Sequence, residues 1–198
     1  MSPLFETTKS FAQVEFSEKG VNTRDFIEAS ESLLSLFDLL GSGVFGFVQA
    51  DLRNNLDGVR QRFISHPDKS QTVESLVQTE VNEPHRHATA CLVRFVRGLA
   101  FTCKALQNSQ NDASVELHVC FKRSYDEILR HHHNFVIRSL VAVAIHAVPR
   151  RQDFYTRIAQ GGSVPKLESE MKKWLESLEV IVKHLREFLE GGGYGRVI

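Results

Sequence analysis

The sequence predicts an all-α protein, and three observations lead to this fold class. Apolar residues recur at spacings of three and four positions through long stretches of the chain, which is the period of an amphipathic helix. Strict alternation of apolar and polar residues, the pattern of a half-buried strand, is hard to find over five or more positions. The 198 residues include only 5 prolines, so few helices are interrupted. Without a linker long enough to divide domains, we expect one domain over residues 1–198.

Four helices are expected in the first half of the chain. The first, over 22–41, has Asp25 in its acidic first turn and stops at Gly41. The second, over 44–65, carries an apolar stripe and ends before Pro67. A short helix over 73–81 ends before Pro84. The long helix over 86–107 precedes the polar segment 108–114, which we expect to form a loop.

The second half continues with helices over 115–130 and 135–147, separated by three consecutive histidines. The helix over 135–147 is apolar nearly all round, so we expect it to be buried. A short helix over 153–159 is followed by a break at Gly161 and Gly162 and by an amphipathic helix over 166–189. The glycine-rich tail from Gly191 is expected to be flexible.

Charge and cysteine content narrow the class of protein. There are 24 Lys and Arg against 24 Asp and Glu, which disfavours a nucleic-acid partner. No apolar run approaches the roughly 20 residues that cross a bilayer, and the N-terminal residues lack a secretory leader, so we expect a cytoplasmic protein. Cys91, Cys103 and Cys120 match neither a disulfide framework nor a zinc motif. We expect them to be reduced and in the core.

Motifs for catalysis are missing from the sequence. There is no GxSxG, HExxH or P-loop pattern. The three histidines 131–133 are consecutive, so on a helix their side chains splay about 100° apart, and no second ligand shares a face with them. We therefore expect no catalytic residue, no metal and no cofactor, and we do not expect an enzyme.

A polar pair lies beside the apolar stripe of the second helix. Asp51 and Asn55 are four positions apart, which puts a carboxylate and an amide about 6 Å apart on one helix face. Together they can accept and donate hydrogen bonds in one place, although a solvated helix edge has the same pattern. Arg94 and Arg97 on the next long helix are equally ambiguous, because arginines often pair with carboxylates or cover apolar surface.

The order of several segments is more specific. LFDLLG, VFGFVQAD with Asn55 after it, LVRFVRGLAF, SYDEIL, HHHNFVIR and AVPRRQDF follow one another along the chain. In this order and near this spacing the sequence resembles the glycolipid transfer protein superfamily, over about residues 26–159. The resemblance implies a two-layer all-α sandwich of about eight helices that holds one sphingolipid, with the headgroup at a surface site and the chains in an apolar tunnel.

The same resemblance implies roles for individual residues. Asp51 would accept hydrogen bonds from the ceramide amide or headgroup hydroxyls, Asn55 would bind the headgroup, and His133 would bind the amide carbonyl. The implied function is transfer of a sphingolipid between membranes, without covalent chemistry. A lipid sensor or adaptor regulated by sphingolipid occupancy is the alternative from another class. The partners are then a sphingolipid and, transiently, a membrane surface; the oligomeric state is left open.

Departures from the family pattern concern the headgroup. Glycolipid-binding members have a tryptophan where this chain has Arg94, and a lysine where it has Gly58. The ceramide-1-phosphate branch has an arginine at the Arg94 position, but a lysine where this chain has Asn55 and a second arginine where it has Ala90. Because a guanidinium can grip two phosphate oxygens, the sequence favours ceramide-1-phosphate over a neutral glycosylceramide.

Two further sets of residues follow from the resemblance. The expected tunnel wall consists of Phe37, Leu40, Phe45, Val141, Ile145 and Phe154, for which a packed core is the alternative. The expected membrane-docking patch consists of Phe135, Arg150, Arg151 and Tyr155, aromatic side chains for the interface and cations for anionic lipids. Docking would make the protein transiently peripheral to membranes.

Overall fold

The computed structural model describes residues 9–40 and 46–197, and these are almost entirely helical. The α-helices of this part are α2 (Thr23–Leu40), α3 (Gly46–Ser65), α4 (Val73–Glu80), α5 (His87–Asn111), α6 (Leu117–Ile128), α7 (Phe135–His146), α8 (Arg151–Ala159) and α9 (Val164–Gly191). Short 3-10 turns are η1 (Phe11–Gln13), η2 (Pro67–Lys69), η3 (Arg130–His132) and η4 (Tyr194–Val197). A two-residue hairpin pairs β1 (Phe16–Ser17) with β2 (Gly20–Val21). The predicted all-α class is confirmed.

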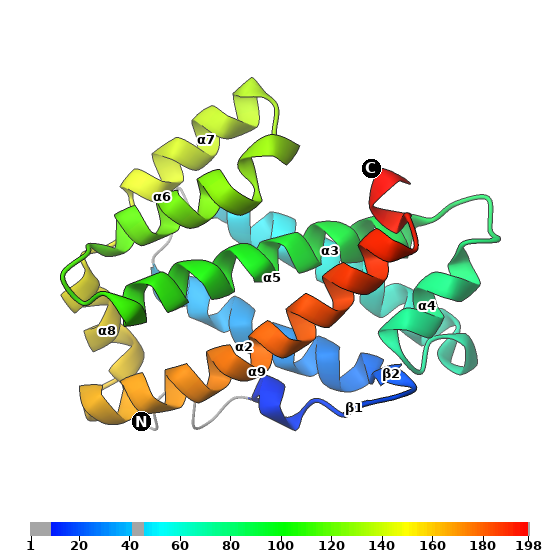
Figure 1. The fold of residues 1–198 in the computed structure, drawn as a ribbon, viewed down its shortest axis with the longest axis horizontal. Coiled ribbons are helices and arrows are strands. Elements are labelled where there is room, and N and C mark those ends of the chain that lie inside the picture. The colour runs from blue at the N-terminus through cyan, green and yellow to red at the C-terminus, as the bar shows by residue number, and fades with distance from the viewer. Residues whose placement is uncertain (1–8, 41–45, 198) are drawn as a thin grey trace.

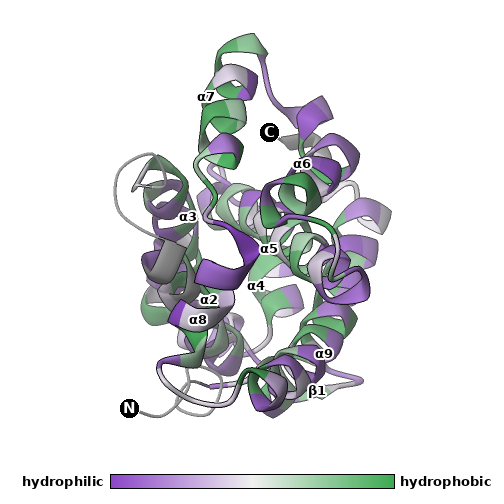
Figure 2. Cartoon of the chain, turned by 90° about the vertical axis from the view of Figure 1, so that its left-hand side faces the viewer, coloured by the Kyte–Doolittle hydropathy of each residue, from purple (hydrophilic) through white to green (hydrophobic). Residues whose placement is uncertain are grey.

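The helices form two layers that meet at α5 (Figures 1 and 2). Helices α5, α6 and α9 make one layer, and α2 and α3 lie against the other side of α5. Aromatic side chains join the elements: the rings of Phe26 and Phe95 meet edge-to-face at 6.1 Å, and those of Phe101 and Phe121 at 5.6 Å. Such pairs add stability beyond the apolar area they bury.

The first described residues belong to the core. Phe11 is buried, and its ring packs edge-to-face on Trp174 of α9 at 5.3 Å. The hairpin is held by Glu74 of α4, whose carboxylate accepts a hydrogen bond from the Val21 amide and lies 2.6 Å from Nε2 of His184. One buried acid thus ties the hairpin to helices on both sides of it.

Two boundaries differ from the sequence prediction. Helix α5 continues to Asn111, into the segment expected to be a loop, because Ser109 is buried there and its hydroxyl meets the Tyr155 hydroxyl at 3.3 Å. The tail expected to be flexible forms η4, in which the Tyr194 ring lies on the Phe188 ring at 5.4 Å. In both cases tertiary contacts outweigh the polar or glycine-rich local sequence.

The burial predicted for the helix over 135–147 is wrong. Within α7, Ala144 and Ile145 are buried, but Phe135 is 83% exposed and Val136 is 63% exposed. The physical reason is that α7 packs along α6 at the edge of the molecule and projects beyond the other helices, as its largely hydrophobic ribbon shows in Figure 2. An apolar helix here faces outward on one side.

Other expectations about the chain concern its cysteines and membrane spans. Cys91, Cys103 and Cys120 are free and buried, as predicted, and burial raises the pKa of the Cys103 thiol to about 12. None of the described helices combines the length and the apolar character that crossing a membrane requires.

Candidate functional site

A mostly apolar cavity of about 340 Å³ lies between α3, α5, the α6–η3 corner and α7. That volume falls in the range of about 300–1,000 Å³ typical of small-molecule sites. Its apolar wall is formed by Phe37, Phe47, Val48, Leu52, Gly98, Phe101, Phe121, Leu129, Ile137, Val141, Ala144, Ile145 and Val148, and its polar residues are Asp51, Arg94, Arg97, Thr102, His132 and His133.

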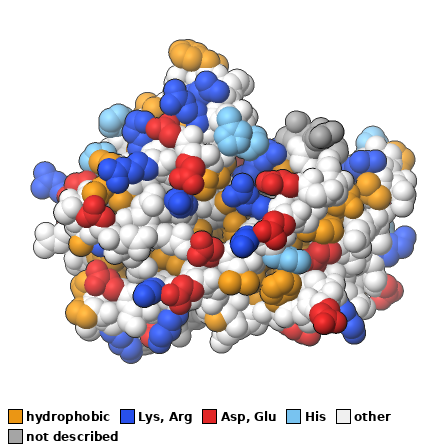
Figure 3. All heavy atoms as spheres, in the orientation of Figure 1, with side chains coloured by type: hydrophobic (Ala, Val, Ile, Leu, Met, Phe, Trp, Pro, Cys, Tyr) orange, Lys and Arg blue, Asp and Glu red, His pale blue; other side chains and the backbone are white. Residues whose placement is uncertain are grey.

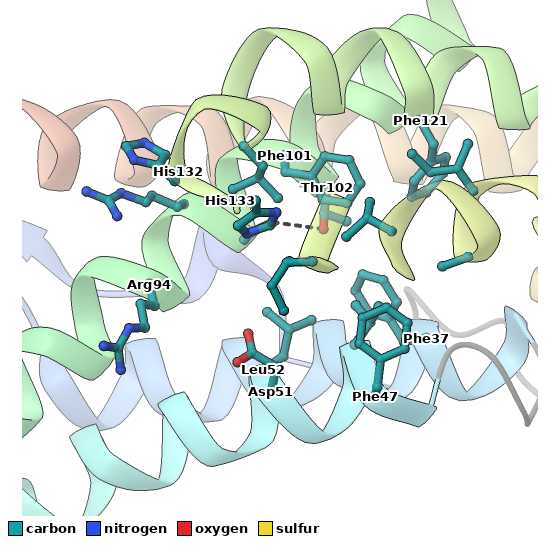
Figure 4. Close-up of a pocket in the computed structure, with 18 of the residues that line it drawn as sticks. Phe37, Phe47, Asp51, Leu52, Arg94, Phe101, Thr102, Phe121, His132 and His133 are labelled. Carbon is teal, nitrogen blue, oxygen red and sulfur yellow. Dashed lines mark hydrogen bonds between the residues drawn. The ribbon is translucent and has the colours of Figure 1, made fainter. Parts of the chain in front are cut away.

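Polar and apolar residues are segregated along this cavity (Figure 4). Arg94 and His132 lie at one end, and Phe37, Phe47 and Phe121 lie at the other. Asp51, on α3, points into the space below His133, which enters from the opposite side. The cavity can therefore hold a molecule that has one polar end and a hydrocarbon body.

The two predicted polar residues of α3 take different positions. The Asp51 side chain lines the cavity and makes no hydrogen bond or ion pair with any described residue. Asn55 is buried and does not line the cavity, because its amide donates a 2.8 Å hydrogen bond to the backbone carbonyl of Asp51. The pair expected on one face is thus split, and Asn55 supports the helix turn that carries Asp51.

His133 is half-buried and sits in a defined hydrogen-bonding environment. Its Nδ1 atom lies 3.2 Å from the hydroxyl of Tyr125, a buried residue of α6. Burial lowers the pKa of His133, the nearby Asp51 carboxylate opposes this shift, and Arg138 and Arg97 add to it. Burial also raises the pKa of the Tyr125 hydroxyl. At neutral pH the pair is therefore a neutral imidazole and a protonated phenol.

Positive charge accumulates at the polar end of the cavity. The side chain of Arg94 is exposed and that of Arg97 is half-buried. Neither guanidinium forms a hydrogen bond or ion pair with any described residue. Burial lowers the pKa of Arg97, and the charge of Arg94 lowers it further. Desolvation, followed by the charge of Arg97, lowers the pKa of His132 to about 4. This end of the cavity favours a negatively charged or strongly hydrogen-bonding group.

Sequence reasoning left Arg97 ambiguous and missed Tyr125 and His132 as part of this site. Arg94 and Arg97 are three positions apart on α5, so one helix face carries both to the cavity. The signal for His132 was the run of three histidines, of which His132 and His133 line the cavity. Tyr125 gave no signal, because its role depends on packing between α6 and η3. No group of three metal-ligating side chains occurs among the described residues.

The predicted tunnel residues divide into three groups. Phe37, Val141 and Ile145 line the cavity. Phe154 does not, because it is fully buried in the core, where its ring meets that of the following residue, Tyr155, at 5.7 Å. Phe45 and the side chain of Leu40 lie outside the described residues.

The structure corrects the predicted docking patch as well. Phe135 and Arg150 are exposed. Tyr155 is only 4% exposed, and the Arg151 guanidinium stacks 4.6 Å over its ring while donating to Ser109. Because these contacts use both side chains inside the protein, neither Arg151 nor Tyr155 is available to a membrane surface.

Comparisons with known proteins agree with this architecture. A family model described as glycolipid transfer protein matches residues 21–160. A glycolipid transfer protein of Aureobasidium melanogenum is 38% identical over 186 residues, 93% of this chain and 92% of the relative. One of Danio rerio is 30% identical over 158 residues, 75% of this chain and 76% of the relative.

Solved structures show the same similarity. HET-C2, a fungal glycolipid transfer protein, superimposes with a TM-score of 0.89 at 36% identity, covering 94% of this chain and 96% of that one. Mouse ceramide-1-phosphate transfer protein reaches a TM-score of 0.87 at 20% identity, covering 98% of both chains. At 20% identity, the similarity to ceramide-1-phosphate transfer protein shows a shared fold only.

Proposed function

The chain belongs to the glycolipid transfer protein family, and on this basis we propose that it binds one sphingolipid and moves it between membranes. The family consists of lipid transfer proteins, and the proposed transfer requires no covalent chemistry. The observation that carries the proposal is the cavity, in which an apolar interior ends in a neutral imidazole and a carboxylate that has no partner among the described residues. A sphingolipid has the matching parts: hydrocarbon chains, an amide and a polar headgroup.

The amide of the lipid is proposed to lie between Asp51 and His133. The Asp51 carboxylate accepts only, so it suits the amide N–H and a neighbouring hydroxyl. A Tyr125 hydroxyl that donates to Nδ1 of His133 leaves the ring proton on Nε2, which then donates to the amide carbonyl. The two residues thus complement both halves of one amide group, and Asn55 positions Asp51 instead of touching the headgroup.

For the headgroup we favour a phosphate. Arg94 and Arg97 offer two guanidinium groups without partners among the described residues, and a guanidinium fits two phosphate oxygens. The family lysine has no room at Gly58, because a Cβ added there would lie 2.5 Å from Sγ of Cys91. A neutral glycosylceramide is the second candidate. The relatives named glycolipid transfer proteins favour it, and Asp51 can accept from sugar hydroxyls.

Membrane contact is proposed to occur through α7. Its first residues, Phe135 and Val136, are strongly exposed, and Arg150 follows the helix with its side chain in solvent. Exposed aromatic and aliphatic side chains suit a peripheral membrane contact, and Arg150 adds a cation after the opposite end of α7. Because α7 also forms one wall of the cavity, membrane contact and lipid entry would involve the same helix.

The test is transfer between vesicles of fluorescent ceramide-1-phosphate and galactosylceramide that carry the same acyl chain. Asp51→Val should lower the transfer of both lipids by about 10- to 100-fold, the loss expected for a hydrogen bond to a charged group. The matched control is Asp57→Val, because Asp57 is on the same helix and does not line the cavity. Transfer that survives Asp51→Val in a folded protein would contradict the proposed site.

A further inference from the structure

A second cavity adjoins the polar end of the first. It has a volume of about 310 Å³ and lies between α5, η3, the end of α9 and the tail. Arg97 and His132 line both cavities, so the two spaces meet at these side chains. Glu127, His131, Arg186 and Glu190 complete the polar wall of the second one, and Gly193 and Gly195 of the tail also line it.

Charged side chains of both signs surround this second cavity, Arg97 and Arg186 against Glu127 and Glu190. Arg97 contributes a half-buried guanidinium with no hydrogen bond or ion pair to any described residue. Arg186 is 3.6 Å from Glu190, an exposed pair on the surface of α9. His131 and His132 stand opposite with their rings 4.0 Å apart. On the face in Figure 3, basic and histidine side chains gather next to acidic ones between the end of α6 and the end of α9.

The second cavity is large enough to hold more than a phosphate bound at Arg97. An unpaired, half-buried guanidinium is costly, and an anion held at Arg97 would offset that cost. A phosphate seated between Arg94 and Arg97 would use the junction of the two cavities and leave most of the 310 Å³ beyond it. Glu190, the histidine rings and backbone groups there suit hydroxyl groups, because they offer both acceptors and donors.

We propose that the second cavity binds the outer part of an extended sphingolipid headgroup, a polyhydroxylated ring joined to the ceramide through a phosphodiester. The phosphate would lie against Arg94 and Arg97, and the ring would occupy the space lined by His131, Arg186 and Glu190. The inference rests on the proposed function, since it assumes that the ceramide lies in the first cavity. It makes the preferred headgroup larger than a phosphate monoester or a single neutral sugar.

The test compares three lipids with one acyl chain in the vesicle assay: ceramide phosphoinositol, ceramide-1-phosphate and galactosylceramide. Ceramide phosphoinositol should be transferred fastest. Arg186→Gln should slow it by about tenfold, as for one hydrogen bond to a charged group, and leave the other two lipids within about twofold. Lys183→Gln is the control, because it removes a charge from the same helix at a residue that lines neither cavity.

The outcomes separate this inference from the proposed function. Transfer of galactosylceramide or ceramide-1-phosphate, with no advantage for ceramide phosphoinositol, overturns the second site and leaves the lipid transfer function standing. Equal losses for all three lipids in a folded Arg186→Gln protein also overturn it. If none of the three lipids is transferred, both the second site and the lipid transfer function are overturned. Soluble inositol phosphate, measured by calorimetry, distinguishes a headgroup site from a site for free anions: tight binding of the soluble compound without preference for the lipid overturns the proposal.

Discussion

At the scale of single residues, the close packing at Gly58 explains why the proposed headgroup site differs from the family pattern. It lies where α3 comes close to α5, and an added Cβ would be 2.5 Å from Sγ and 2.9 Å from Cβ of Cys91. Contacts this short force the helices apart, so the lysine of glycolipid-binding members cannot be restored here without moving α5. The cationic part of the site therefore comes from α5 itself, through Arg94 and Arg97.

This close approach predicts a stability effect. Gly58→Ala should lower the free energy of unfolding by about 1–3 kcal/mol, the usual cost of overpacking, although alanine is the better helix former. Gly46→Ala is the matched control on the same helix, because nothing lies within 4 Å of the added Cβ. Urea unfolding followed by circular dichroism measures both. Equal stabilities of the two variants would mean that α3 and α5 separate easily.

The family resemblance, applied residue by residue, predicted part of the cavity lining. Asp51, Arg94 and His133 do line one cavity, and Phe37 and Val141 lie in its wall. Asn55 was expected at the headgroup but lies outside the cavity lining, and the pattern that puts two side chains on one face does not say whether one of them bonds to its own helix. Such local competition between side chain and backbone depends on rotamers, which the spacing of residues does not fix.

At the scale of elements, α7 shows how composition can mislead. An apolar helix predicts burial when the alternative is water, but α7 contributes one face to the cavity wall and leaves the other outside. The remaining helices carry an apolar stripe and a polar face. For seven of the eight expected α-helices, the predicted and observed boundaries differ by only a few residues. Periodicity thus predicts elements well, whereas an outward apolar face is visible only after assembly.

The exposed face of α7 predicts a separation of membrane binding from stability. Phe135→Ala should weaken binding to anionic vesicles by about 10- to 150-fold, because a phenylalanine leaving water contributes about 1.5–3 kcal/mol. The free energy of unfolding should change by no more than about 0.5 kcal/mol, since the side chain is 83% exposed. Vesicle sedimentation and thermal unfolding give the two values.

The control for this prediction is Ile64→Ala. Ile64 is also strongly exposed, at 68%, but it belongs to α3 and is followed by the loop to η2. It should have little influence on vesicle binding. Similar losses for both variants would point to general hydrophobic adhesion and would contradict a docking role for α7.

At the scale of the whole molecule, balanced charge conceals an uneven distribution. The chain has equal numbers of acidic and basic residues, yet His132 faces Arg97 of α5, Arg186 of α9 and its neighbours His131 and His133. Desolvation and these charges lower its pKa from 6.5 to about 4. The fold brings these groups together from α5, η3 and α9, which is why the net charge gave no indication of this local cluster.

This arrangement predicts how stability depends on pH. Because the pKa values of His132 and His133 are lowered in the folded protein, the unfolded chain binds more protons below about pH 6.5. Their contribution is constant above that pH, and stability falls as the pH drops toward 4. His132→Gln should therefore gain stability relative to the wild type at pH 5 compared with pH 7.5, as measured by thermal unfolding at the two pH values.

An anionic sphingolipid should reverse this behaviour, since a phosphate beside Arg97 cancels the charge that helps keep His132 neutral. In the complex, His132 then binds a proton at a pH at which it is neutral in the lipid-free protein. Lipid binding should therefore stabilise the protein more at pH 5.5 than at pH 7.5. Galactosylceramide has no charge and should show little of this dependence. Thermal unfolding with each lipid at the two pH values measures the difference. Identical shifts in the unfolding temperature for both lipids would mean that His132 does not interact with the headgroup.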